Sequence, residues 1–194
     1  MMLADVISWI LVAAVLALCL SLFLFQAITG VPSVSATQTE ADDVVALLRE
    51  AGLPEQATIY DLGSGWGKLV AALAKEFPKA RIIGIERSPL PYWVARFRTR
   101  HLAHVRLYRG NFYNFDLRDA QAVTCYLMMK PMPKLARFLN DMLAEGTPVV
   151  ALTFWFRGRV VSAVREGPGL RGAAALYRWP ASEHGASDAG HAST

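Results

Sequence analysis

Asp61-Leu62-Gly63-Ser64-Gly65-Trp66-Gly67 is the stretch that decides the fold, because it connects a short apolar run (57–61) to an Ala- and Leu-rich run (69–77). The first run has the composition of a strand and the second that of a helix. A glycine-rich turn between a strand and a helix is the setting that a nucleotide-type loop requires. Glycine allows positive φ and lets a ligand approach the backbone without meeting a side chain. The stretch therefore predicts a ligand-binding loop within an α/β sheet.

The spacing of the glycines narrows the class of ligand. Gly63, Gly65 and Gly67 alternate with other residues, whereas a dinucleotide fingerprint requires a glycine at the position of Lys68. A phosphate-binding P-loop requires Gly-Lys followed by Ser or Thr, and here Leu69 follows Lys68. The absence of both phosphate motifs favours a ligand whose reactive end carries no phosphate.

Outward from the loop, strand-like and helix-like segments alternate. The predicted strands are 57–61, 81–86, 105–108, 122–128 and 148–156, and the predicted helices are 41–51, 69–77, 91–101 and 133–144. This alternation predicts an α/β fold with a Rossmann-like, doubly wound sheet, mostly parallel and with helices on both faces. Segments 160–164 and 173–179 are expected to add a closing antiparallel pair.

Two acidic residues and one polar–aromatic pair extend the predicted ligand site. Glu86 ends the second predicted strand roughly twenty residues past the glycines, where a carboxylate accepts hydrogen bonds from both ribose hydroxyls. By itself it could equally be a solvated strand end, but its spacing from the loop favours the ligand role. Asp61 is expected to organise the loop and face an amino group of the ligand, or else only to start the turn. After the third strand, Asn111 suits the exocyclic amine of adenine and Phe112 suits its ring.

The amino-terminal segment 6–28 is almost wholly apolar and contains no charge. As a helix rising about 1.5 Å per residue, such a run spans the roughly 30 Å hydrocarbon core of a bilayer. No Lys or Arg precedes it, and it is longer than the core of a signal peptide, which favours an uncleaved anchor over a signal cleaved after 34–36. The predicted organisation is a transmembrane anchor (1–30), a linker (31–40), a ligand-binding domain (41–180) and a disordered tail (181–194).

Composition adds weaker constraints. The chain has 194 residues, enough for one domain and an appendage, and its two cysteines argue against a disulfide or zinc site. A formal charge of +4 indicates a mild bias towards anionic surfaces. Between Glu86 and Asp116 there is no acid, but six arginines occur: Arg87, Arg96, Arg98, Arg100, Arg106 and Arg109. They are explained either by a solvated helix side or by a surface held against anionic lipid.

Together, the glycine loop, Glu86 and Gly110-Asn111-Phe112 resemble the class I S-adenosylmethionine-dependent methyltransferases over residues 40 to 180. The resemblance implies S-adenosyl-L-methionine as the cofactor and no metal. The residues that it assigns to the cofactor site are Asp61, Gly63, Ser64, Gly65, Gly67, Glu86, Asn111 and Phe112. Two positions depart from the usual pattern, namely Trp66 in place of an acidic residue and Asn111 in place of Asp.

A narrower resemblance concerns the predicted anchor and the segment from Tyr126 to Leu135 (Tyr-Leu-Met-Met-Lys-Pro-Met-Pro-Lys-Leu). Both features are similar to the small membrane-associated protein-lysine methyltransferases that modify ATP synthase c-subunits and adenine nucleotide translocase, and to their prokaryotic relatives. This implies a single-pass, membrane-tethered enzyme that methylates a lysine of a membrane protein. Its domain would face the cytoplasm, where the cofactor is made.

The expected chemistry needs little beyond alignment, because the methyl group of the cofactor is already activated. A desolvated channel lowers the pKa of a lysine amine, so no dedicated base is required. Tyr126 and Met128, at the carboxyl end of the fourth strand, are expected to line this channel, or else simply to pack there. Nucleic acid is disfavoured as a substrate, since the Asp/Asn-Pro-Pro-Tyr/Phe motif of base amino-methylation is absent. Methylation of a lipid or small lipophilic molecule, and a non-catalytic cofactor-binding membrane adaptor, remain alternatives. The sequence leaves the acceptor and the oligomeric state open.

Overall fold

The computed structural model describes residues 2–29, 36–166 and 172–180, with the side chains of the first segment described over 5–21. The chain divides into two compact units, residues 1–33 and residues 34–194. The predicted tail (181–194) lies outside the described residues, and so does the first half of the predicted linker (31–35). The unit from residue 34 onward contains the sheet and all the predicted site residues.

Helix α1 (Met2–Thr29) occupies the segment in which the sequence predicts a membrane anchor. Across the described residues, no helix is both long and apolar enough to cross a membrane. This finding overturns the prediction of a transmembrane anchor over 1–30, and with it the prediction of a single-pass membrane protein facing the cytoplasm. The bilayer loses its support as a partner for the same reason.

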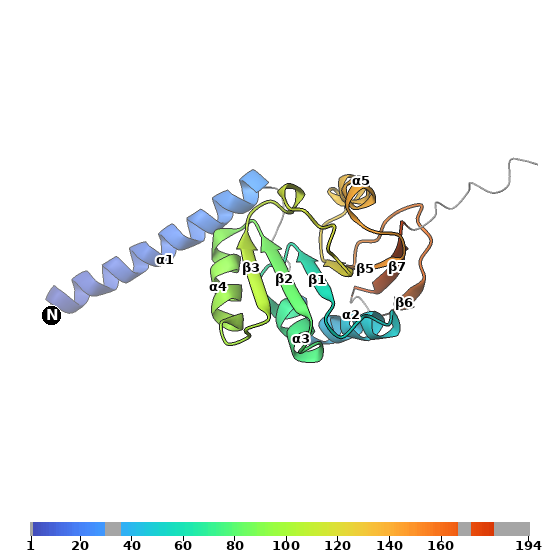
Figure 1. Cartoon of the computed structure of the whole chain (residues 1–194). Coiled ribbons are helices and arrows are strands. Elements are labelled where there is room, and N and C mark those ends of the chain that lie inside the picture. The colour runs from blue at the N-terminus through green and yellow to red at the C-terminus, as the bar shows by residue number, and fades with distance from the viewer. Residues whose placement is uncertain (1, 30–35, 167–171, 181–194) are drawn as a thin grey trace, which may run out of the picture. The chain divides into compact units, whose positions relative to one another are not determined.

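A seven-stranded sheet forms the centre of the second unit, with strand order β3-β2-β1-β4-β5-β7-β6 (Figure 1). The strands are β1 (Thr58–Leu62), β2 (Arg81–Glu86), β3 (Val105–Arg109), β4 (Ala122–Cys125), β5 (Thr147–Leu152), β6 (Ala163–Arg165) and β7 (Ala174–Trp179). Neighbours among β1 to β5 pair in parallel, whereas β7 pairs antiparallel with both β5 and β6. The predicted Rossmann-like α/β sheet, mostly parallel with an antiparallel closing strand, is therefore confirmed.

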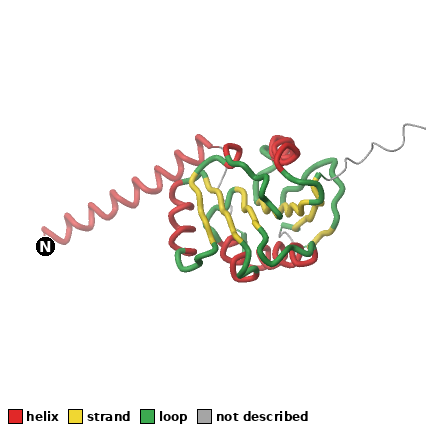
Figure 2. Tube along the Cα trace, in the orientation of Figure 1, coloured by secondary structure: helices red, strands yellow, loops and turns green. Residues whose placement is uncertain are grey.

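Helices cover the two faces of this sheet unequally (Figures 1 and 2). The described helices of this unit are α2 (Gln38–Glu50), α3 (Lys68–Glu76), α4 (Pro89–Thr99), the short 3₁₀ helix η1 (Phe112–Asn114) and α5 (Met132–Met142). Successive strand residues point to opposite faces, so Ile59 packs with α2 and α3 while Tyr60 packs with α5. The face that α5 covers is completed by aromatic side chains from loops, among them Phe115 and Trp155.

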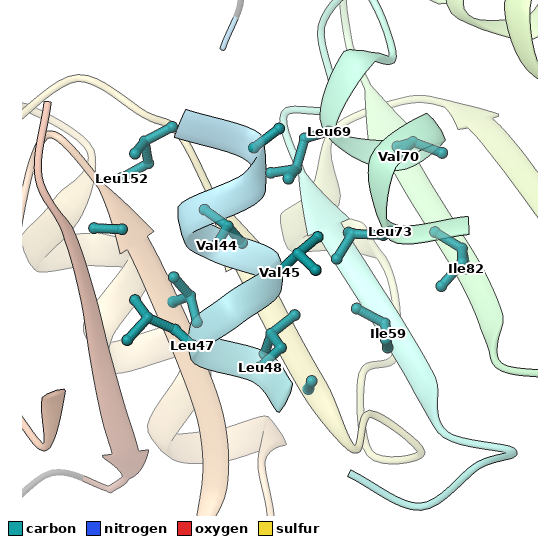
Figure 3. Packing of buried hydrophobic residues seen from close by; sticks show 14 of the residues in the cluster. Val44, Val45, Leu47, Leu48, Ile59, Leu69, Val70, Leu73, Ile82 and Leu152 are labelled. Atoms are coloured by element: carbon teal, nitrogen blue, oxygen red, sulfur yellow. The ribbon is translucent and has the colours of Figure 1, made fainter. Parts of the chain in front are cut away.

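The core under α2 shows why this helix forms (Figure 3). Val44, Leu47 and Leu48 recur at helical spacing and are fully buried against the sheet. The hydroxyl of Thr37 accepts the N–H of Glu40 at 3.3 Å, and the Glu40 carboxylate accepts the N–H of Thr37 at 2.7 Å. This capping box starts the helix at Gln38, three residues before the predicted start at residue 41.

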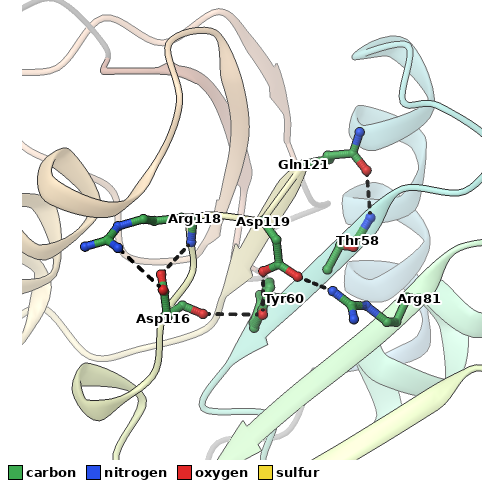
Figure 4. Close-up of polar contacts among 7 residues, drawn as sticks. All are labelled: Thr58, Tyr60, Arg81, Asp116, Arg118, Asp119 and Gln121. Atoms are coloured by element: carbon green, nitrogen blue, oxygen red, sulfur yellow. Dashed lines mark hydrogen bonds and ion pairs between the residues drawn. The ribbon is translucent and has the colours of Figure 1, made fainter.

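The connection from β3 to β4 contains only η1 among its described residues and is held to the sheet by polar contacts (Figure 4). The Tyr60 hydroxyl donates to Asp119 Oδ1 at 2.8 Å, and the Arg81 guanidinium pairs with the same carboxylate. The N–H of Thr58 donates to Gln121 Oε1 at 3.1 Å. These contacts fix the end of the connection on β1 and β2, so its beginning stays at the opposite, carboxyl edge of the sheet.

Candidate functional site

The predicted site residues meet at the carboxyl edge of the parallel strands. In the sheet register, Leu62 at the end of β1 lies beside Ile85 of β2 and Cys125 of β4, and Glu86 lies beside Arg109 of β3. The loops that follow these four strand ends therefore converge. In open α/β sheets this edge, beside the strand at which the order reverses, is where ligands bind.

The glycine loop turns tightly between β1 and α3. Gly63, Gly65 and Gly67 have φ angles of 77°, 51° and 75°. The N–H groups of Gly63 and Ser64 donate to the carbonyl of Ile85 at 2.9 and 3.0 Å, which ties the loop to β2. A Cβ at Gly67 would lie 2.7 Å from Ala95 of α4, so both its backbone angle and its neighbour require glycine.

Two buried carboxylates flank the loop. Glu86 accepts the N–H of Gly65 at 2.8 Å and the N–H of Ser88 at 2.6 Å, one on each oxygen. Asp61 accepts the hydroxyl of Thr124 at 2.9 Å and is 2% exposed. Burial, and to a lesser degree the nearby charge of Glu86, raise the pKa of Asp61 to about 7, although the Thr124 hydrogen bond opposes the shift. The site therefore favours a ligand that brings positive charge to Asp61.

A small pocket lies over the loop. The described residues that line it are Ala36, Asp61, Gly63, Ser64, Trp66, Lys68, Leu69 and Tyr126. The hydroxyl oxygen of Ser64 is buried and has no hydrogen-bond partner within the described part of the chain. Tyr126, predicted for the substrate channel, thus faces the same space as Asp61.

The other predicted residues lie around this pocket rather than in it. Asn111 is exposed directly after β3, and its Oδ1 accepts the N–H of Tyr113 at 3.3 Å. Phe112 is half-buried against the core on the α5 side. Met128 is half-buried and does not line the pocket over the loop. The structure therefore brings Tyr126 to the glycine loop and leaves Met128 further along the same segment.

Several lining residues were missed by sequence reasoning. Lys68 was not among the predicted site residues, and Ala36 lies in the predicted linker, yet both line the pocket. Arg98 of α4 donates to the carbonyl of Trp66 at 2.6 Å and so supports the loop from outside. The start of α3 immediately after Gly67 is the signal that could have found Lys68. No sequence signal locates Ala36 or Arg98, because both depend on packing between elements.

The residues at the carboxyl edge fit an adenosine ligand that ends in a cationic amino acid. The three glycines leave the loop backbone open to close approach, and each Glu86 oxygen retains a lone pair for a ribose hydroxyl. The buried Asp61 suits an ammonium group. The chemistry of this donor and acceptor set matches S-adenosylmethionine, which carries both a ribose and a cationic amino-acid end.

The fold and the site define the class of S-adenosylmethionine-dependent methyltransferases. The crystal structure of an RNA methyltransferase from Salinibacter ruber in complex with S-adenosyl-L-homocysteine matches this chain with a TM-score of 0.67 and 28% sequence identity. The match covers 75% of this chain and 93% of that one. S-adenosylmethionine is the cofactor of this class.

Within that class, the chain belongs to the ANTKMT methyltransferase domain family, whose model matches residues 61–163. It is 30% identical over 128 residues to the ATP synthase c-subunit lysine N-methyltransferase of Xenopus laevis, a match that covers 64% of this chain and 54% of that protein. It is 28% identical over 131 residues to a protein-lysine N-methyltransferase of Saccharolobus islandicus (strain REY15A), with 66% of this chain and 81% of that protein covered. The chain thus spans about half the length of the Xenopus relative.

Proposed function

We propose that this protein methylates a lysine side chain of a protein substrate, with S-adenosylmethionine as the methyl donor. The observation that carries the proposal is the family match over residues 61–163, which extends from the glycine loop through the segment after β5. Relatives named as lysine N-methyltransferases from a vertebrate and from Saccharolobus islandicus support the lysine acceptor.

In this proposal the cofactor lies along the carboxyl edge of β1, β2 and β3. The turn made by Gly63, Ser64, Gly65 and Gly67 holds its amino-acid end against Asp61. Glu86 accepts hydrogen bonds from the ribose hydroxyls, while Asn111 and Phe112 flank the adenine. The bound cofactor supplies a methyl group that its sulfonium has already activated.

The remaining task of the chain is to present a neutral amine in line with that methyl group. Tyr126, beside Asp61, and Met128, two residues further on, are proposed to form the wall of the acceptor channel. A half-buried wall of this kind excludes water, which lowers the pKa of a lysine amine and favours the form that has a lone pair. Proximity and desolvation then replace a dedicated base.

The test is transfer of isotopically labelled methyl groups from S-adenosylmethionine to a protein extract, followed by hydrolysis and amino-acid analysis. Wild-type protein should produce labelled methyllysine. Glu86→Gln should lower the rate at sub-saturating cofactor by about tenfold, since it weakens a charged hydrogen bond. Glu55→Gln, at an exposed carboxylate paired with Lys79, is the matched control and should leave the rate unchanged. Label that never enters protein would contradict the proposal.

RNA is a second candidate acceptor, favoured by the likeness to the Salinibacter ruber RNA methyltransferase and by one surface of α4. There, Trp93 and Phe97 are 57% and 67% exposed, and the guanidinium groups of Arg96 and Arg100 stack over their rings at 5.6 and 3.8 Å. Exposed aromatic rings among arginines are a surface on which unpaired bases stack. Label removed by ribonuclease, and retained after protease treatment, would identify RNA as the acceptor.

A further inference from the structure

A groove separate from the pocket over the glycine loop lies where the segments after β4 and β5 meet the start of α5. It encloses about 480 Å³. We call it the 129–157 groove, after the first and last residues of its lining, which includes Met129, Lys130, Met132, Trp155, Phe156 and Arg157. The proposed cofactor site uses none of these residues.

The segment after β4 connects this groove to the cofactor pocket. Tyr126 lines the pocket, Leu127 contacts the position where Gly63 would carry a Cβ, at 2.7 Å, and Met129 lines the groove. Four consecutive residues thus run from one site to the other. In a sheet of this kind the cofactor lies over the glycine loop after β1, so the neighbouring groove is positioned to receive the acceptor.

The aromatic wall of the groove is fixed by contacts from behind. The ring of Phe156 packs edge-on against the rings of Tyr177 and Trp179, with centroid separations of 5.3 and 5.0 Å, respectively. The backbone N–H of Phe156 donates to the Tyr177 hydroxyl at 3.2 Å. The indole N–H of Trp155 donates to the carbonyl of Ala173 at 3.1 Å. The wall begins after Thr153, a non-glycine residue held at a φ of 66°. A wall held in this way offers a preformed apolar surface.

The rim of the groove is positively charged. Lys130 and Arg157 are both exposed, and the described lining includes no carboxylate. Helix α5 starts at Met132 in the groove, with no acidic residue in its first turn and no side-chain cap from Pro131. The amino end of a helix carries partial positive charge, which adds to the two cations. The groove therefore complements a ligand that combines an apolar part with an anionic group.

We propose that the 129–157 groove binds the acceptor segment and selects a target lysine that has an acidic residue beside it. Lys130 and Arg157 are the specificity-determining residues: they attract the neighbouring carboxylate and disfavour a second cation at that position. The apolar wall of Trp155 and Phe156 receives the aliphatic part of the segment. This inference rests on the proposed lysine methylation, and it adds the chemical class of the sequence around the lysine.

The kinetic test compares three peptides that contain one lysine and differ only in its neighbours, which are Glu, Gln or Arg. Wild-type protein should give a kcat/KM for the Glu peptide about 5- to 10-fold above the Gln peptide, with the Arg peptide lowest. The preference should shrink in high salt because both cations are exposed. Lys130→Gln combined with Arg157→Gln should reduce it to about twofold or less, and Arg157→Glu should favour the Arg peptide. Lys79→Gln, an exposed cation at the opposite sheet edge, is the control and should keep the wild-type preference.

A binding measurement separates this inference from the proposed function. The same peptides are titrated by calorimetry into the protein in the presence of S-adenosyl-L-homocysteine, so that no transfer is needed. Preferential binding of the Glu peptide that is lost in Arg157→Glu would support the groove, even if no peptide is methylated. Absence of methylation in that case would count against the proposed lysine methylation and not against the groove. Methylation of all three peptides at equal rates, or equal binding of all three, would overturn the inference. Circular dichroism of each variant checks that these exposed substitutions leave the fold intact.

Discussion

Replacing Asp61 with Asn should make the ligand-free protein more stable at alkaline pH, although it damages the proposed cofactor site. Asp61 is 2% exposed, and its pKa in the folded protein is raised from the usual 3.8 to about 7. A carboxyl group with a raised pKa stabilises the fold fully below pH 3.8, and this contribution is lost as the pH rises through 7. At pH 8 the difference between the two pKa values corresponds to about 4 kcal/mol against the folded state.

The neutral amide introduced by Asp61→Asn would avoid that penalty, but it brings an NH₂ group that needs a partner, at a cost of about 1–3 kcal/mol. The net gain in the free energy of unfolding should therefore be about 1–3 kcal/mol at pH 8 and should vanish or reverse near pH 5. Urea unfolding of wild type and Asp61→Asn across this range measures it. Asp141→Asn, at an exposed residue of α5, is the control. Its free energy of unfolding should differ from that of wild type by the same amount at both pH values. An Asp61→Asn effect of the same size at both pH values would refute the reasoning.

The affinity of wild type for the cofactor should increase with pH, whereas the contribution of Asp61 to stability decreases with pH. Because the ligand's ammonium interacts with ionised Asp61, the affinity of wild type for S-adenosylmethionine should rise with pH through about 7. Asp61→Asn should bind roughly 10- to 100-fold more weakly at pH 8, the loss expected for a hydrogen bond between charged groups. Calorimetry over the same pH range measures both quantities. An affinity that is flat with pH in wild type would show that Asp61 does not face the ligand's charge.

Two further substitutions test how the loop and the sheet are supported, both by urea unfolding. Gly67→Ala should destabilise the protein by about 2–4 kcal/mol, because a Cβ there meets Ala95 at 2.7 Å in a backbone with a φ of 75°. Gly146→Ala, at a φ of 82° with open space around it, should cost only the backbone strain of about 1 kcal/mol, and equal losses at the two sites would refute the packing argument. Tyr60→Phe should cost about 1–2 kcal/mol by removing the hydrogen bond to Asp119, whereas Tyr108→Phe, at a 45% exposed edge residue, should cost little. Equal effects of the two tyrosine substitutions would contradict a role for the Asp119 contact.

The sequence predicted the sheet well wherever hydrophobic pattern and turn residues act locally. The second strand was predicted with its observed limits, Arg81–Glu86, and the glycine loop with its observed place between β1 and α3. Strands β4 and β5 were predicted to extend beyond their observed ends, Cys125 and Leu152. The apolar residues that follow have the composition of a strand but lie outside the sheet. Periodicity cannot distinguish a residue in the sheet from one that packs beside its edge.

Those same residues form the part of the site that the sequence predicted least well. Tyr126 and Met128 were both predicted to line the substrate channel. Tyr126 lines the pocket that also contains Asp61, and the channel role of both residues stays a prediction. Lys130 and Arg157 lie 27 positions apart in the chain, and only the parallel pairing of β4 with β5 brings their loops together. Contacts of that kind depend on tertiary structure and leave no local signal.

The charges at the two ends of the site suit the two reactants of a methyl transfer to an amine. On the cofactor side, buried Asp61 and Glu86 favour a cationic ligand. On the proposed acceptor side, Lys130 and Arg157 disfavour an ammonium group and so lower the pKa of an incoming lysine, which must be neutral to react. The same two cations would weaken binding of a bare lysine, and a carboxylate beside it in the substrate would offset that loss. An acidic neighbour is thus what allows a surface that repels a bare ammonium group to bind a segment that carries a lysine.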